Sequence, residues 1–145
     1  RDRNGGDIAK ALALGADAIA IGHSVMMALN CNKEIPESDF EAEMGVPAGS
    51  CYHCHTGRCP VGVATQDPEL RKRLDPEEAA ERVYNFLHTL TLEAQLLARA
   101  CGKTDIHSLE PEDLAALTME ASAMAQVPLA GTDMTVGVEN YHKLG

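Results

Sequence analysis

Residues 10–22 read KALALGADAIAIG, and this stretch indicates the class of fold. Apolar residues from Ile8 to Ala18 recur at roughly helical spacing, and Gly15 stands where helices commonly end. Ala18 to Gly22 then form a short all-apolar run, typical of a strand buried on both faces of a parallel sheet. Helical spacing resumes from His23 to Leu29. Helix, buried strand and helix are the repeating unit of a parallel α/β fold.

A single strand cannot form a sheet, because its backbone N–H and C=O groups need neighbouring strands as partners. We therefore expect further strands to precede residue 1. On this interpretation the sequence is the C-terminal part of a larger protein.

The second informative stretch is rich in cysteine. Cys51, Cys54 and Cys59 follow one another with gaps of two and four residues, and a proline follows the third. Iron–sulfur clusters are held by thiolates, and a Cys-Pro pair closes the ligand run of bacterial ferredoxins. Gly57 and Gly62 supply the permissive backbone of a tight loop. The spacing favours an iron–sulfur cluster bound by the three cysteines, and three ligands best suit a three-iron cluster.

Other interpretations of the cysteines stay open at this point. A disulfide would leave an odd cysteine and would need an oxidising compartment. Structural zinc needs four ligands, and His53 and His55 each adjoin a cysteine, which makes joint ligation of one ion awkward. A distant fourth ligand such as Cys31 would relieve that problem. A four-iron cluster would need Cys31, Cys101 or a ligand from outside the protein.

Composition limits the classes of function. The chain has 145 residues, about one domain, and is 45% hydrophobic, with no Trp and 3% aromatic residues. Twelve basic and 22 acidic residues give a net charge of −10, which argues against nucleic-acid and anionic-membrane partners. Nothing approaches the roughly 20 apolar residues of a membrane-spanning helix. We expect an acidic, soluble, cytoplasmic protein.

From Asp67 onward the sequence predicts helices. Pro68 to Leu74 predict a short helix, and Asp75-Pro76-Glu77-Glu78 combine a capping residue, Pro at the first helical position and acidic residues in the first turn. The helix that follows is expected to end near Gly102. Another start is expected at Glu110 to Asp113, and residues 131–145 are expected to form an extended tail.

Two stretches resemble a known family. Residues 10–22 resemble the last helix–strand unit of flavin-binding TIM barrels. Residues 54–66, CHTGRCPVGVATQ, are similar to the cluster loop of glutamate synthase, and residues 102–117 resemble the helical segment after it. The resemblance covers about residues 3–131 and points to the FMN-binding, synthase-type domain of the glutamate synthase large subunit.

The resemblance implies an α/β fold: the C-terminal end of a (β/α)8 TIM barrel, then a cysteine-rich cluster loop and a mainly helical tail. Residues 1–30 would be the last helix–strand–helix unit of the FMN-binding barrel, residues 31–66 the cluster loop, residues 67–130 the helical segment and residues 131–145 the tail.

The family's activity is also an expectation here. It implies an oxidoreductase that uses FMN and a [3Fe-4S] cluster to form L-glutamate from 2-oxoglutarate and from ammonia, which glutamine supplies. Electrons would come from an NAD(P)H-linked subunit or from ferredoxin. A relative with another substrate, such as a methylamine–glutamate methyltransferase subunit, stays open, as does a zinc-stapled interaction module.

The resemblance also implies site residues. Gly22, at the end of the expected strand, would let backbone N–H groups approach the FMN phosphate, with His23 and Arg3 as further phosphate-site residues. Cys51, Cys54 and Cys59 would bind the cluster, although the longer glutamate synthases space the first two cysteines further apart. Cys31 falls where the family often has a cysteine. His53, His55 and Arg58 would donate hydrogen bonds and positive charge to the cluster. No catalytic side chain is expected within the chain.

Overall fold

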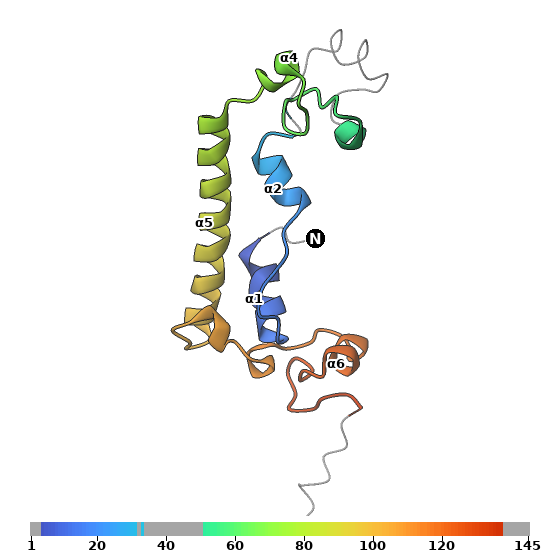
Figure 1. The fold of residues 1–145 in the computed structure, drawn as a ribbon. Coiled ribbons are helices and arrows are strands. Elements are labelled where there is room, and N and C mark those ends of the chain that lie inside the picture. Colours follow the sequence, from blue (N-terminus) through green and yellow to red (C-terminus); the bar gives the residue numbers. More distant parts are fainter. Residues whose placement is uncertain (1–3, 32, 34–50, 138–145) are drawn as a thin grey trace, which may run out of the picture. The chain divides into compact units, whose positions relative to one another are not determined.

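The computed structural model describes residues 4–31, 33 and 51–137 (Figure 1). Regular structure in these residues is helical: α1 (Gly5–Ala13), α2 (His23–Ala28), η1 (His53–Thr56), α4 (Pro68–Arg71), α5 (Pro76–Ala100), η2 (Ile106–Ser108), η3 (Pro111–Asp113) and α6 (Met119–Ala125). The described residues fall into two compact units. Residues 21–31, 33 and 51–88 form the first, and residues 4–20 with 89–137 form the second, so α5 contributes to both.

The caps of the helices follow from local sequence. Asn4 caps α1, because its side-chain oxygen accepts a hydrogen bond from the N–H of Asp7 at 3.2 Å. Asp75 caps α5 in the same way, with the N–H groups of Glu77 and Glu78 as donors. Both α1 and α5 end in glycines with positive φ, Gly15 and Gly102.

The predicted buried strand at residues 18–22 is not confirmed. These residues form no strand or helix, and they are exposed or half-buried. A parallel strand requires hydrogen-bond partners on a neighbouring strand. No described residue supplies them for this segment, and the described residues contain only two isolated β-bridges, Arg58 with Thr65 and Ala116 with Leu129.

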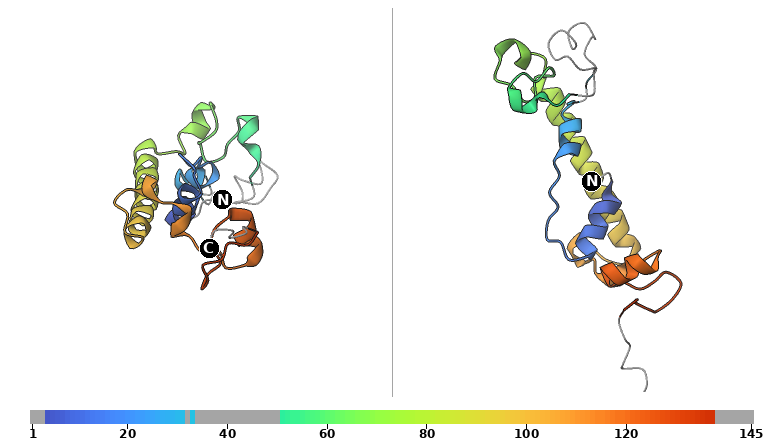
Figure 2. Two further views of the ribbon diagram at one scale, coloured as in Figure 1. Left: turned by 90° about the horizontal axis from the view of Figure 1, so that it is seen from below. Right: turned by 90° about the vertical axis from the view of Figure 1, so that its right-hand side faces the viewer.

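In the second unit, α1 lies beside residues 89–100 of α5 (Figure 2). Gly5 makes this close approach possible, because a Cβ there would lie 2.7 Å from the backbone N of Ala94. Its N–H donates a hydrogen bond to the Glu93 carboxylate at 2.6 Å. Small and branched apolar residues form the core of this unit: Ala9, Ala13, Ala98 and Leu109, with Ile106 and Leu114 packed against them.

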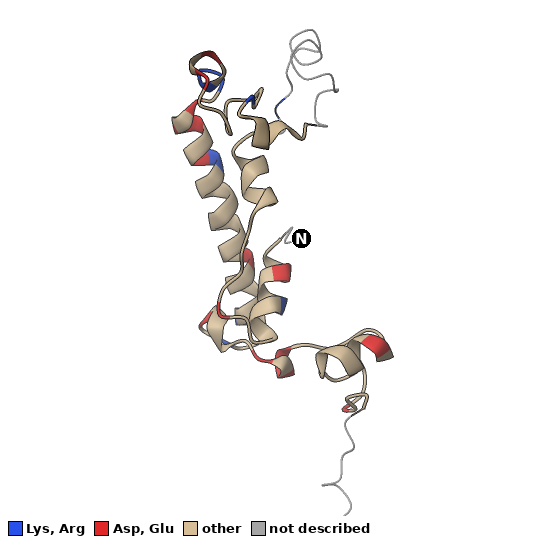
Figure 3. Ribbon diagram, turned by 45° about the vertical axis from the view of Figure 1, so that its right-hand side comes forward, with Lys and Arg blue, Asp and Glu red and all other residues tan. Residues whose placement is uncertain are grey.

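The apolar residues of α5 are only partly buried. Ala79, Leu90, Ala94 and Ala98 are buried, whereas Leu87 and Leu97 are 39% and 40% exposed. Acidic residues mark the start of α5, and the basic run 71–73 begins in the last turn of α4 (Figure 3). Among the described residues, no helix combines the length and the apolar character that crossing a membrane requires.

Candidate cysteine site

The cysteine-rich loop begins with a short 3₁₀ turn, η1, that contains Cys54. The Thr56 hydroxyl donates a hydrogen bond to the carbonyl of His53 at 2.8 Å and accepts one from the N–H of Arg58. Thr56 therefore stabilises this turn through its side-chain hydroxyl. Gly57 then turns the chain with φ of 76°, and Gly62 does so with φ of 83°. Both values lie in the left-handed region that favours glycine, as predicted.

Hydrogen bonds close the loop on itself. Arg58 and Thr65 form an antiparallel bridge, and the Thr65 hydroxyl donates a hydrogen bond to the carbonyl of Gly57. The same hydroxyl accepts a hydrogen bond from the N–H of Asp67 at 3.0 Å. The two ends of the segment between Gly57 and Asp67 are thus held together by bonds made within it. The sequence had not indicated Thr65 as a structural residue.

The three cysteines of the loop differ in exposure. Cys59 is 5% exposed, and Pro60 after it is fully buried, whereas Cys51 is half-buried and Cys54 is exposed. All five cysteines of the chain lie in the described residues, and none forms a disulfide. The disulfide interpretation therefore finds no support here.

Cys31 is placed beside these cysteines by the end of α2. The N–H of Asn30 donates to the carbonyl of Met27, and the N–H of Cys31 donates to that of Met26 at 3.0 Å. With Asn30 at φ of 72°, this pair of bonds is the Schellman helix end. Burial raises the pKa of the Cys31 thiol, and the neighbouring Cys54, Cys59 and Cys51 raise it further. These three thiols are therefore close enough to Cys31 to affect its pKa.

The donor set suits an iron–sulfur cluster. Thiolates are the ligands that such clusters use, and here three cysteines lie within residues 51–59 and a fourth lies at the adjacent end of α2. Among the described residues, no three His, Cys, Asp or Glu side chains stand at the spacing that a single metal ion needs. A cluster has several irons, each with its own protein ligand, so its ligands stand further apart than those around one ion.

The segment from α4 to Leu74 packs directly on the turn that follows Cys59. A Cβ on Gly62 would lie 2.6 Å from the carbonyl oxygen of Leu70 and 3.0 Å from the N of Leu74. The Arg73 guanidinium donates a hydrogen bond to the carbonyl of Pro60 at 3.0 Å. Arg73 was not identified from the sequence. Its only signal there is its place in the basic run 71–73, which does not distinguish it from its neighbours.

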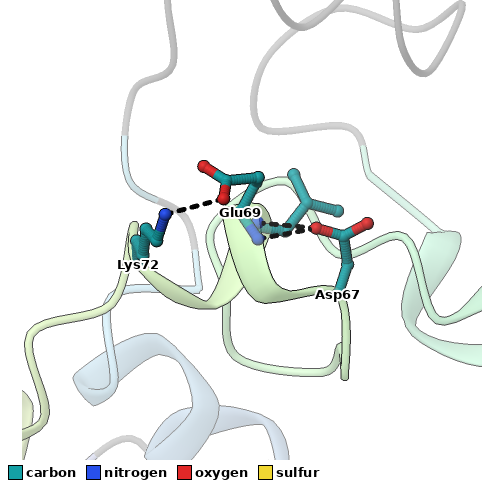
Figure 4. Close-up of polar contacts among 4 residues, drawn as sticks. Asp67, Glu69 and Lys72 are labelled. Atoms are coloured by element: carbon teal, nitrogen blue, oxygen red, sulfur yellow. Dashed lines mark hydrogen bonds and ion pairs between the residues drawn. The ribbon is translucent and has the colours of Figure 1, made fainter.

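Asp67 fixes the start of α4 (Figure 4). Its carboxylate accepts hydrogen bonds from the N–H groups of Leu70 and Glu69, and these bonds, with a smaller effect of the Arg58 charge, lower its pKa. Lys72 pairs with Glu69 at 2.6 Å on the exposed face. Arg58 is exposed and directly precedes Cys59 in sequence. Its positive charge contributes to the lowered pKa of Asp67.

The residues expected at the flavin phosphate are only partly described. Gly22 is the N-cap residue of α2 and His23 its first residue, and both are exposed. No neighbouring atom lies within 4 Å of the position that a Cβ on Gly22 would occupy. Arg3 lies outside the described residues. The assignment of these three residues to a phosphate site stays a prediction.

Comparison with known proteins identifies the region that contains the cysteine loop. Residues 41–104 match the family described as the conserved region in glutamate synthase. The chain is of the glutamate synthase type. Residues 3–35 match the FMN-dependent dehydrogenases, which supports FMN as a cofactor and relates this glutamate synthase-type chain to TIM-barrel oxidoreductases. No solved structure matches the chain.

Curated relatives agree with this family. The chain is 56% identical over 135 residues to a glutamate synthase large subunit-like protein of Rhizobium meliloti, covering 93% of the chain and 30% of the relative. It is 44% identical over 103 residues to the archaeal glutamate synthase [NADPH] of Methanocaldococcus jannaschii, covering 71% of the chain and 17% of the relative. An archaeal-type glutamate synthase [NADPH] of Dehalococcoides mccartyi is 38% identical over 107 residues, covering 74% of the chain and 18% of that protein. The chain thus spans less than a third of the length of each of these relatives.

Proposed function

We propose that this chain is the cluster-bearing part of an oxidoreductase that forms L-glutamate from 2-oxoglutarate and ammonia by using FMN and an iron–sulfur cluster. The observation that carries the proposal is the cysteine-rich segment 51–59, whose three thiols lie inside the region that matches glutamate synthases. Glutamine would supply the ammonia. An NAD(P)H-linked subunit or ferredoxin would supply electrons, and the setting would be cytoplasmic.

In this proposal Cys51, Cys54 and Cys59 hold a [3Fe-4S] cluster, which would supply one-electron transfer when bound. The buried Cys59 and Pro60 keep water away from one side of the site, and the bonds of Thr65 hold the loop closed. Gly22, His23 and Arg3 hold the FMN phosphate in the proposed barrel.

Serine substitutions in the full-length protein test the ligand set. Cys54→Ser and Cys59→Ser are each expected to abolish cluster assembly, and Cys51→Ser is expected to do the same. Cys101, exposed at the end of α5, provides the matched control, and Cys101→Ser should leave the iron content unchanged. If Cys51→Ser retains iron while Cys31→Ser loses it, the proposed ligand set is wrong and Cys31 replaces Cys51.

The same preparations separate the alternatives. An iron–sulfur protein is brown, whereas a zinc-stapled module would be colourless and would contain zinc in place of iron and sulfide. Assays that compare ammonia with methylamine as the nitrogen substrate distinguish glutamate formation from the related methylamine reaction. Iron and sulfide absent from the purified wild-type protein, and not taken up on anaerobic reconstitution, would overturn the proposal.

A further inference from the structure

The side chain of Arg73 reaches the backbone beside a proposed cluster ligand. Its guanidinium donates a hydrogen bond at 3.0 Å to the carbonyl of Pro60, which directly follows Cys59 and is fully buried. The two residues lie 13 positions apart, so the bond joins the cysteine loop to the segment after α4. Such a contact holds the cysteine loop in a fixed position against the segment after α4.

The surrounding packing holds this contact from both sides. The N–H of Arg73 donates to the carbonyl of Leu70 at 3.1 Å, which anchors the backbone of Arg73 to the end of α4. On the other side, the N–H of Gly62 donates to the carbonyl of Cys59 and closes the turn around Pro60. Gly62 in turn lies against the backbone of Leu70. A displacement of Arg73 would therefore move the turn that begins at Cys59.

The guanidinium of Arg73 also carries a positive charge that acts on the cysteine site. A guanidinium stays charged at every physiological pH, and its planar fork of donors holds an acceptor in a defined direction. A cavity beside Val61 is lined by three cationic side chains, Lys33, Arg73 and Arg82, and by the carboxylates of Asp75 and Glu78. Glu78 is paired with Arg82. Arg73 thus brings a half-buried positive charge next to the turn that carries a thiolate.

We propose that Arg73 is a positioning residue of the iron–sulfur site: its hydrogen bond to Pro60 fixes the Cys59 thiolate, and its charge favours the reduced cluster. The inference rests on the proposed function, because it needs a cluster at Cys59. Positive charge near a cluster offsets the negative charge added on reduction and so raises the reduction potential. Groups that orient metal ligands commonly change metal affinity by about 10-fold or more when they are removed.

The test compares Arg73→Gln with Arg71→Gln in the full-length protein. Arg71 is an exposed residue of α4, two positions from Arg73. Each substitution removes one positive charge, so Arg71→Gln is the matched control. Each apoprotein is reconstituted with ferrous iron and sulfide, and the midpoint potential is measured by electron paramagnetic resonance. We expect Arg73→Gln to weaken iron loading by about 10-fold and to lower the midpoint potential, while Arg71→Gln stays close to the wild type in both.

Arg73→Lys keeps the charge but loses the planar fork, so it separates the two effects and decides the matter if Arg73→Gln fails to fold. It should keep a potential close to that of the wild type while loading iron less well. Equal behaviour of Arg73→Gln and Arg71→Gln, or wild-type loading together with a lowered potential in Arg73→Lys, would overturn the inference. A wild-type protein that takes up no cluster would instead refute the proposed function itself.

Discussion

At the scale of single residues, Gly62 is the position where the cysteine loop is most sensitive to added volume. Gly62→Ala should destabilise the protein by more than the roughly 1 kcal/mol that a positive φ alone imposes on alanine. The added methyl would meet the backbone of Leu70 and Leu74 and push the turn away from α4. Gly57→Ala is the matched control, because Gly57 has a similar φ with open space around it. Thermal unfolding and cluster retention measure both, and equal losses for the two substitutions would contradict this account.

Ser122 is a small residue whose replacement should lower the stability of the protein measurably. It is fully buried, its hydroxyl donates to the carbonyl of Val127 at 2.8 Å, and it accepts from the N–H of Val136 at 3.0 Å. Ser122→Ala would leave both backbone groups without this partner, so we expect a loss of about 1–3 kcal/mol in unfolding free energy. Denaturant unfolding of Ser122→Ala and of the exposed control Ser108→Ala measures it. A loss no larger than that of the control would disprove the role.

At the scale of elements, α4 should respond to pH through Asp67. Its pKa is lowered in the folded protein by the bonds to Leu70 and Glu69, so its charge stabilises α4 above the ordinary carboxyl range and this stabilisation is lost as the pH falls. Asp67→Asn keeps a capping side chain without the charge. The melting temperature of the wild type should exceed that of Asp67→Asn near pH 7, and the gap should close below about pH 4. A gap that widens in acid would show the opposite linkage.

The elements also show which features were predictable. Asp75-Pro76, Gly15 and Gly102 identify helix ends correctly, because capping depends on residues within one turn. The N-cap of α1 is Asn4, so the helix begins earlier than the apolar pattern that starts at Ile8 indicates. Residues 18–22 have the composition of a buried strand, but a strand also depends on partners that its own sequence does not contain.

In the candidate site too, features set by local sequence were predictable, and features that depend on distant residues were not. The cysteines and the two loop glycines were recognisable, because spacing and positive φ are local properties. The hydrogen bond from Arg73 to Pro60 and the closure by Thr65 depend on how the chain folds back on itself, and three neighbouring cations at 71–73 look alike in sequence. The proximity of Cys31 to the loop was left open for the same reason.

At the scale of the whole molecule, the isolated 145 residues are expected to show no glutamate synthase activity. The segment 18–22 has no strand partner among the described residues, and a parallel sheet cannot form without one. The chain also spans 30% of its Rhizobium meliloti relative. An assay for 2-oxoglutarate-dependent glutamate formation, with the full-length protein as the positive control, measures this. Turnover by the isolated chain would refute the expectation.

The closure of the loop between Gly57 and Asp67 has a consequence for how such a site can change in evolution. The bonds described for this loop are made inside residues 53–73, and α2 ends independently at Asn30. Insertions or deletions between Cys31 and Cys51 therefore leave these bonds intact. Doubling the length of a flexible connection adds only about 0.6 kcal/mol of closure entropy. The spacing before the loop can thus drift among descendants of one ancestral gene, while the loop itself is inherited as a unit.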